Sequence, residues 1–201
     1  MAKQERALKT RHALVRAAAT RFDRDGYAGA SLSQIRDAAR ISMGALTFHF
    51  SSKAELADAI EGGARAMIAE VVEQVSAKGT PSLDLAVELT LELTRLLEEQ
   101  EMVRAAARLA RERPGSPEWS SAWVPALRRM LEQLQREGSL RPPASPERVA
   151  ALAACLVEGM DIVLRRRADP ATASTVPVSA VEELAQMWGL ILTGLRPGPS
   201  G

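Results

Sequence analysis

Residues 31–50 carry the most specific pattern in this 201-residue chain, and the chemistry that it indicates is recognition of DNA. Ser31 and Gln34 have the spacing of a capping box, in which each side chain satisfies an amide at the start of a helix. Apolar residues follow at helical spacing, and Ser42 is suited to cap a second short helix that begins at Met43. Two short helices joined by a tight turn form a helix-turn-helix, whose second helix enters the major groove. An ordinary helical hairpin is the alternative.

The side chains expected to contact DNA lie in and beside these two helices. Lys53 opens the next helix, where its charge and the amides there both favour a phosphate. Thr47 and His49 are suited to donate hydrogen bonds to the DNA backbone. Gly44 permits a close approach of the backbone, to the first helix or to a phosphate, and Met43 either contacts a thymine methyl or packs against the protein. For each side chain the alternative is a solvated surface position. The complete predicted set is Ser33, Arg36, Ser42, Met43, Gly44, Ala45, Thr47, His49 and Lys53.

Basic residues are concentrated in the same part of the chain. Residues 1–53 hold ten basic and four acidic side chains, a net charge of +6, so the remainder carries −5. A basic N-terminal part on a slightly acidic body suits a polyanionic partner, and Lys3, Arg6 and Lys9 are expected to form an arm on the DNA. A solvated basic face is the alternative.

Catalytic and metal-binding patterns are absent from the sequence. Its two histidines are His12, predicted on an exposed helix face, and His49, in the DNA-reading segment. The single cysteine, Cys155, lies in an apolar run and is expected to be a buried structural thiol. Neither a phosphate-binding glycine loop nor a metal motif is found. We therefore expect a protein that is not an enzyme and holds no cofactor or metal.

No segment has the character of a targeting or membrane-spanning sequence. Residues 1–9 are charged and no apolar block follows them. The longest nearly uninterrupted apolar stretch, 149–157, is far shorter than a membrane span. We expect a cytoplasmic protein with no membrane partner.

The pattern along the chain predicts an all-α fold of about nine helices. Apolar residues recur at helical spacing, and the alternation typical of strands is absent. Breaks rich in Pro, Gly, Ser or Thr are predicted at 78–82, 113–117, 140–144 and 169–177. The helices are expected at about residues 5–24, 31–40, 43–50, 51–77, 82–99, 101–112, 118–137, 145–167 and 179–195.

We expect two functional parts. Residues 1–53 form a three-helix DNA-binding head that contains the helix-turn-helix, and residues 54–201 form a helical bundle for ligand binding and dimerisation. The long helix over 51–77 links them. The helices at 145–167 and 179–195 have more apolar surface than a single body of this size needs, which favours packing against their copies in a homodimer.

Several motifs resemble the TetR family of bacterial transcriptional repressors. They are the segments 21–27, 35–39 and 44–53 (GALTFHFSSK), so the resemblance is strongest over about residues 6–60. Towards the C-terminus, Trp123 and the segment 183–194 resemble the γ-butyrolactone receptor branch of that family, which is found in actinomycetes.

The resemblance implies a dimeric repressor that binds a palindromic operator in double-stranded DNA. It also implies release by a small lipophilic effector of γ-butyrolactone type, and regulation of secondary metabolism. Members of the family dimerise through their last two helices. Met43 and Thr47 depart from the family pattern, where Lys and Tyr are common, so the operator sequence is not carried over.

Two tryptophans mark the segment in which an effector is expected to bind. Trp119 and Trp123 are four residues apart, so in a continuous helix they share a face. Filling of a core or an interface is the alternative, whereas the resemblance implies that Trp123 stacks on the effector. Apolar walls with a few polar anchors suit a lipophilic molecule, and the candidate anchors are Thr90, Glu158 and Asp161. The candidate walls are Trp119, Trp123, Leu89, Leu93, Leu96, Val103, Leu127, Met130 and Met160.

Two further functions fit the same features. One is a TetR-type regulator that senses drug-like compounds or pathway products, and the other is a DNA-binding protein with no effector. A ligand that changes both tryptophan emission and DNA retention distinguishes a sensor from a protein of the second kind.

Overall fold

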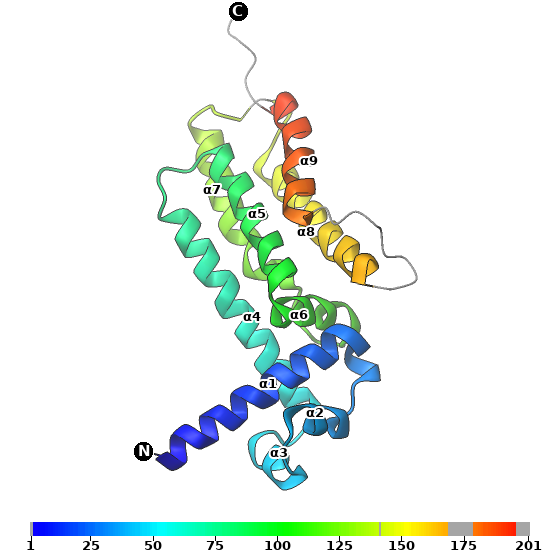
Figure 1. Cartoon of the computed structure of the whole chain (residues 1–201). Coiled ribbons are helices and arrows are strands. Elements are labelled where there is room, and N and C mark those ends of the chain that lie inside the picture. Colours follow the sequence, from blue (N-terminus) through cyan, green and yellow to red (C-terminus); the bar gives the residue numbers. More distant parts are fainter. Residues whose placement is uncertain (1, 141, 169–178, 196–201) are drawn as a thin grey trace, which may run out of the picture. The chain divides into compact units, whose positions relative to one another are not determined.

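Helices make up the regular structure in the part of the chain that the structure describes, residues 2–140, 142–168 and 179–195 (Figure 1). In this computed structural model the all-α prediction is confirmed for those residues. The predicted break at 169–177 lies outside the described residues. The helices are α1 Ala2–Gly29, α2 Leu32–Ala39, α3 Met43–His49, α4 Lys53–Ser76, α5 Leu83–Glu99, α6 Glu101–Glu112, the 3-10 turn η1 Trp119–Ala122, α7 Val124–Arg136, α8 Pro146–Ala168 and α9 Ala180–Leu195.

The chain divides into two compact units. The first consists of residues 1–67 and 100–119, and the second of residues 68–99 and 120–201. The first unit therefore contains α1 to α3, the beginning of α4, and α6, which is distant from them in sequence. The division of functions between residues 1–53 and 54–201 stays a prediction.

The core of the first unit is built where α1 meets the short helices. Leu14, Ala18 and Phe22, one turn apart along α1, are completely buried, as are Ile35 of α2 and Leu46 of α3. Complete burial of each of the larger apolar side chains stabilises the folded state by roughly 1.5–3 kcal/mol. Two short helices that are unstable alone are thereby held on one long helix.

The predicted end of the first helix at Gly26 corresponds to a kink within α1. Gly26 has φ 76° and ψ 174°, a conformation open essentially only to glycine. The kink leaves backbone groups without helical partners, and α6 supplies them. The guanidinium of Arg108 donates to the carbonyl oxygens of Asp23 (2.7 Å) and Arg24 (2.9 Å), and the Glu112 carboxylate accepts from the Tyr27 amide (2.8 Å).

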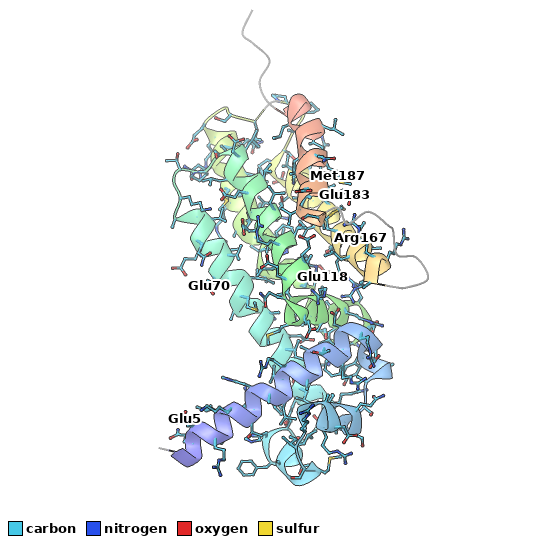
Figure 2. The ribbon with its side chains drawn as sticks, in the orientation of Figure 1. Glu5, Glu70, Glu118, Arg167, Glu183 and Met187 are labelled. Carbon is cyan, nitrogen blue, oxygen red and sulfur yellow. The ribbon has the colours of Figure 1, made fainter. Side chains whose placement is uncertain are left out.

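The second unit is a bundle in which α5 packs against α7, α8 and α9. Leu89, Leu93 and Leu97 form the buried face of α5. Trp188 of α9 donates its indole N–H to the Thr90 hydroxyl of α5 at 2.8 Å, which satisfies two polar groups in the interior. Arg167 and Glu183, labelled in Figure 2, form an ion pair between α8 and α9.

The predicted helix over 118–137 is interrupted, and the interpretation of its two tryptophans as one helical face is wrong. Trp119 lies in η1, whereas Trp123 precedes α7 with φ −132° and ψ −29°. The cause is Pro125 in the first turn of α7. Proline has no N–H to donate to the carbonyl oxygen four residues before it, so a preceding helix cannot continue through Pro125 with its full set of hydrogen bonds.

The prediction that Cys155 is buried is also wrong for the single chain, in which its side chain is exposed. α8 turns Ala153, Val157 and Met160 into the bundle. Cys155 lies on the opposite side of the helix, because residues two positions from a buried one do not share its face.

Replacing Gly26 by alanine should destabilise the first unit. The backbone conformation alone costs about 1–3 kcal/mol for a residue with a Cβ, and the new Cβ would lie 2.7 Å from Arg108 Nη2 and still closer to the Glu112 carboxylate. The free energy of unfolding, measured in urea, should fall by at least about 2 kcal/mol. Gly62→Ala in α4 is the matched control, because nothing lies within 4 Å of its added Cβ. Equal stabilities of the two variants would contradict the expectation.

Candidate nucleic-acid interface

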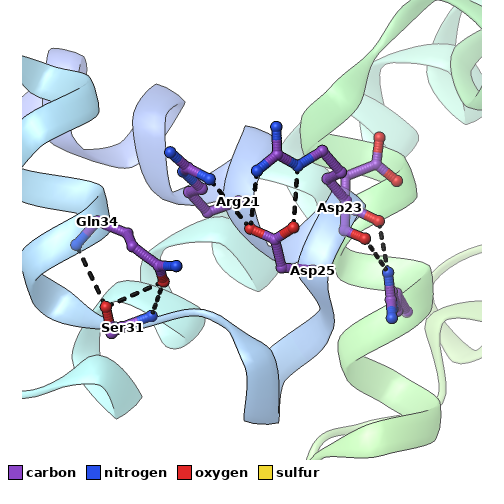
Figure 3. Close-up of polar contacts among 7 residues, drawn as sticks. Arg21, Asp23, Asp25, Ser31 and Gln34 are labelled. Atoms are coloured by element: carbon purple, nitrogen blue, oxygen red, sulfur yellow. Dashed lines mark hydrogen bonds and ion pairs between the residues drawn. The ribbon is translucent and has the colours of Figure 1, made fainter.

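The helix-turn-helix forms by the caps that the sequence predicts. The Ser31 hydroxyl accepts from the Gln34 amide (3.3 Å) and the Gln34 side-chain oxygen accepts from the Ser31 amide (2.8 Å), as Figure 3 shows. α2 ends at Arg40 in the left-handed conformation, φ 57°. The Ser42 hydroxyl then accepts from the Ala45 amide at 3.1 Å and starts α3. The turn between the two helices is therefore only three residues long, 40–42.

Charged groups beside this motif are largely paired with one another. At the end of α1, Asp25 accepts hydrogen bonds from Arg24 (2.9 Å) and Arg21 (3.2 Å; Figure 3). The bond from Arg24 is the main reason why the pKa of Asp25 is lowered. At the start of α4, hydrogen bonds from the Ser51 hydroxyl and amide lower the pKa of Glu55. These bonds favour the ionised form of both carboxylates; Asp25 pairs with side chains of its own helix, and Glu55 satisfies the Ser51 amide at the start of α4.

α3 is fixed to the unit by one side only. Leu46 and Phe50 are buried, and Ala45 and His49 are half-buried. Successive helical residues are about 100° apart, so Gly44 and Phe48 point away from Leu46. Phe48 is 80% exposed.

Four residues make up the exposed face of α3, namely Met43, Gly44, Thr47 and Phe48. Three of them belong to the predicted DNA-contacting set. The Thr47 hydroxyl lies 3.1 Å from the Met43 carbonyl oxygen and 3.2 Å from that of Gly44, so its proton is used within the helix. Phe48 was not predicted; the alternation of exposed and buried positions around Leu46 is the signal that would have found it.

Gly44 is not needed for packing within the protein. Nothing lies within 4 Å of a Cβ built on this residue. Of the two predicted reasons for a glycine here, close approach to the first helix is therefore excluded, whereas close approach to DNA remains.

Lys53 has a structural role that the sequence did not predict. Its ammonium group donates to the carbonyl oxygens of Tyr27 (2.7 Å) and Ala30 (3.1 Å) and lies 4.4 Å from the centre of the Tyr27 ring. A lysine carries three N–H donors, so two acceptors leave one for a phosphate. The predicted phosphate contact stays a prediction.

The other residues of the predicted set differ in exposure and in partners. Ser33 and Ser42 are exposed, and the half-buried Arg36 forms an ion pair with Asp37. His49 packs edge-on against the Phe48 ring, with centroids 5.1 Å apart. In the predicted arm, Arg6 and Lys9 are exposed, and the side chain of Lys3 lies outside the described part.

The candidate effector residues do not all belong to one unit. Val103 and Trp119 are buried but lie in the first unit, whereas the other wall candidates belong to the second. Of the anchors, Thr90 and Asp161 are buried; Thr90 accepts from Trp188, and Asp161 pairs with Arg165 at 3.1 Å. Glu158 is exposed, so it does not line the interior of this chain. The buried candidates of the second unit are Leu89, Leu93, Trp123, Leu127, Met130 and Met160, with Leu96 half-buried.

The described residues contain neither a candidate membrane-spanning helix nor a candidate metal cluster. No helix there is long and apolar enough to cross a membrane. No group of three or more His, Cys, Asp or Glu side chains there is arranged to hold a metal ion.

A basic segment bearing a capped helix-turn-helix, with one face of its second helix outside the core, defines the class of helix-turn-helix DNA-binding regulators. Comparison with known proteins agrees, since residues 14–60 match the model of the bacterial regulatory proteins of the tetR family. The chain is 33% identical to the A-factor receptor protein of Streptomyces griseus in an alignment that covers 98% of this chain and 68% of that protein. The chain belongs to the TetR family and is a transcriptional regulator rather than an enzyme.

Solved structures of the family resemble the chain along almost its whole length. A γ-butyrolactone receptor, described as an ArpA-like protein, has a TM-score of 0.74 at 28% identity, covering 96% of this chain and 90% of that one. CprB from Streptomyces coelicolor in complex with its biological operator sequence has a TM-score of 0.75, also at 28% identity and with the same two coverages.

Replacing Lys53 by alanine should reduce stability. Hydrogen bonds to a charged group contribute about 1.5–3 kcal/mol, and the variant leaves two carbonyl groups without their donor, so the free energy of unfolding should fall by about that amount. Lys9→Ala is the control, because Lys9 makes only an exposed pair with Glu5. An unchanged free energy for Lys53→Ala would refute the structural role. A phosphate contact would show separately in the slope of the logarithm of the DNA-binding constant against the logarithm of the salt concentration. In Lys53→Ala this slope would be flatter by about one unit.

Replacing Gly44 by alanine should leave the fold intact and weaken DNA binding. The added methyl group has room in the free protein, and alanine favours a helix by up to about 1 kcal/mol. On DNA the same methyl would separate α3 from the groove, and we expect at least about a tenfold loss of affinity. Gly62→Ala again serves as the control and should bind DNA like the unmodified chain. Retention of full affinity by Gly44→Ala would show that α3 does not approach DNA on this side.

Proposed function

We propose that the protein is a dimeric repressor that binds a palindromic operator and is released by a small lipophilic effector of γ-butyrolactone type, thereby regulating genes of secondary metabolism. The observation that carries the proposal is the face of α3 formed by Met43, Gly44, Thr47 and Phe48. This face lies opposite the buried residue Leu46, and it makes no packing contribution at Gly44. It is therefore available to a partner such as DNA.

Dimerisation through α8 and α9 is supported by the apolar side chains that these helices leave exposed. Ile162 of α8 is 47% exposed and Leu190 of α9 is 79% exposed, and Leu152 is also accessible. Leu152, Cys155, Gly159 and Ile162 follow one another at spacings of three or four residues, which places them along one side of α8. A two-fold dimer covers such a surface with its own copy, and it presents two recognition helices to two half-sites.

Effector binding in the second unit is supported by its composition. Wall candidates from α5, α7 and α8 are buried in helices that pack against one another, and Trp123 is among the largest of the completely buried side chains. A mostly apolar interior with few polar groups suits a lipophilic ligand. The similarity to a γ-butyrolactone receptor supports the choice of ligand class.

Release would follow from a shift in population. The operator-bound dimer holds its recognition helices at the separation of the half-sites. An effector that binds better to another separation lowers the share of dimers able to bind DNA, by as much as its affinities for the two states differ. The chain itself crosses between the units inside α4 and at the two ends of the segment 100–119, so these positions provide a covalent path for the signal.

The test selects an operator from a random duplex library, measures its dissociation constant, and titrates the complex with a γ-butyrolactone. We expect a selected palindrome, two chains per duplex, loss of DNA on titration and a change in tryptophan emission. Trp123→Phe should raise the lactone concentration needed for release at least about tenfold, through loss of the stacking surface. Trp188→Phe, which removes another buried indole of the same unit, should not.

Selection of no sequence would refute operator binding. Selection followed by full retention of DNA in saturating lactone, with unchanged emission, would refute the effector class and leave the repressor. Screening drug-like compounds and pathway products for DNA release would then decide between a different effector and none.

A further inference from the structure

The exposed face of α3 contains no charged side chain, and its one hydroxyl proton is already used within the helix. It consists of Met43, Gly44, Thr47 and Phe48, and the Thr47 hydroxyl donates within the helix. Base edges are distinguished most specifically by Arg, Lys, Asn, Gln, Asp or Glu, whereas a Ser or Thr hydroxyl can contact either a donor or an acceptor. α3 has none of the charged or amide residue types in any position. The surface that this helix presents is therefore mainly apolar and is suited to select sequence by apolar contact.

Phe48 is the largest side chain on this face and the most exposed large apolar residue of the protein's described part, at 80%. Phe48 lies one helical turn from Gly44, which has no side chain, so the helix surface next to the phenyl ring is open at that position. The His49 ring contacts Phe48 edge-on, with the ring planes at 81°, and restricts where the phenyl group can turn. An exposed apolar ring whose orientation is restricted in this way is suited to contact an apolar group of a binding partner.

The major groove offers one apolar feature to such a residue, the C5-methyl group of thymine. Resting on the proposed function, we propose that Phe48, together with Met43, selects the operator by contact with thymine methyl groups. Each half-site then has thymine at the positions that face these two side chains. Affinity comes from the basic part of the chain, which carries +6 over residues 1–53, and sequence preference from the methyl contacts.

Uracil substitution tests this directly, because deoxyuridine differs from thymidine only in lacking the methyl group and keeps the same base pairing and hydrogen-bonding edge. Each thymine of the selected operator is replaced in turn, and dissociation constants are measured at fixed salt. Loss of one buried methyl contact weakens binding about fourfold. We therefore expect about a fourfold loss at one or two positions per half-site, and about fifteenfold when both half-sites are changed.

The assignment to Phe48 comes from a double-mutant cycle between protein and DNA. Phe48→Ala should bind the thymine operator more weakly than the unmodified chain and should no longer distinguish it from the duplex with uracil at the sensitive position. Leu8→Ala removes another exposed apolar side chain of the same unit and should keep the full preference for thymine. Because Phe48 is exposed, its truncation should leave the thermal unfolding midpoint unchanged.

The possible results separate cleanly. Tolerance of uracil at every position by the unmodified chain refutes thymine recognition, although operator binding stands. An equal loss by Phe48→Ala on thymine and uracil duplexes means that Phe48 contacts the sugar–phosphate backbone, which also refutes the proposal. Unchanged DNA binding by Phe48→Ala would show that the phenyl ring does not contact DNA, and a contact with another protein would then be the explanation for its exposure. If the library yields no operator, the proposed function fails and thymine recognition fails with it.

Discussion

The ammonium group of Lys53 is the contact on which the geometry of the first unit depends. It joins the first residue of α4 to the carbonyl oxygen of Tyr27, in the last turn of α1 after the Gly26 kink, and to that of Ala30, directly after α1. One cationic group with three donors satisfies two carbonyl groups at once, which an apolar side chain cannot do. α6 contacts the same last turn of α1, because the Glu112 carboxylate accepts from the Tyr27 amide. The backbone that leads into the helix-turn-helix is thus held by polar contacts with both α4 and α6.

In this arrangement the outer face of α3 does not contribute to the core of the first unit. A helix of seven residues has little stability of its own, and here Leu46, Phe50 and the Ser42 cap hold it in place. The residues that fix α3 and those that it presents are therefore different residues. Replacements on the presented face can alter what is bound without loss of fold, and this explains how Met43 and Thr47 can depart from the family pattern.

Local chemistry made much of the fold predictable. The caps at Ser31 and Ser42 depend on neighbouring residues only, and both formed as expected. The prediction failed for Trp119 and Trp123, where helical spacing was given more weight than Pro125, although a proline in the first turn limits where a helix begins.

The remaining differences depend on contacts between distant segments. Lys53 was assigned to phosphate because its bonds to Tyr27 and Ala30 exist only once the start of α4 has folded close to the end of α1. Cys155 was expected to be buried because an apolar run does not reveal which of its sides meets the bundle. Phe48 was missed because a phenylalanine is expected in a core, and only its position opposite Leu46 shows otherwise. Val103 was grouped with residues of the second unit because nothing local to α6 indicates that it packs on α1.

The pairing of α6 with α1 has a consequence for how the protein is made. The first unit is discontinuous, since residues 68–99 of the other unit lie between its two segments. During synthesis the carbonyl groups of Asp23 and Arg24 must wait for Arg108, more than eighty residues later in the chain. Contacts of such long sequence separation form slowly. The first unit is therefore completed only after α5 of the second unit has been synthesised, so the surroundings of the helix-turn-helix cannot be finished before the second unit has begun to form.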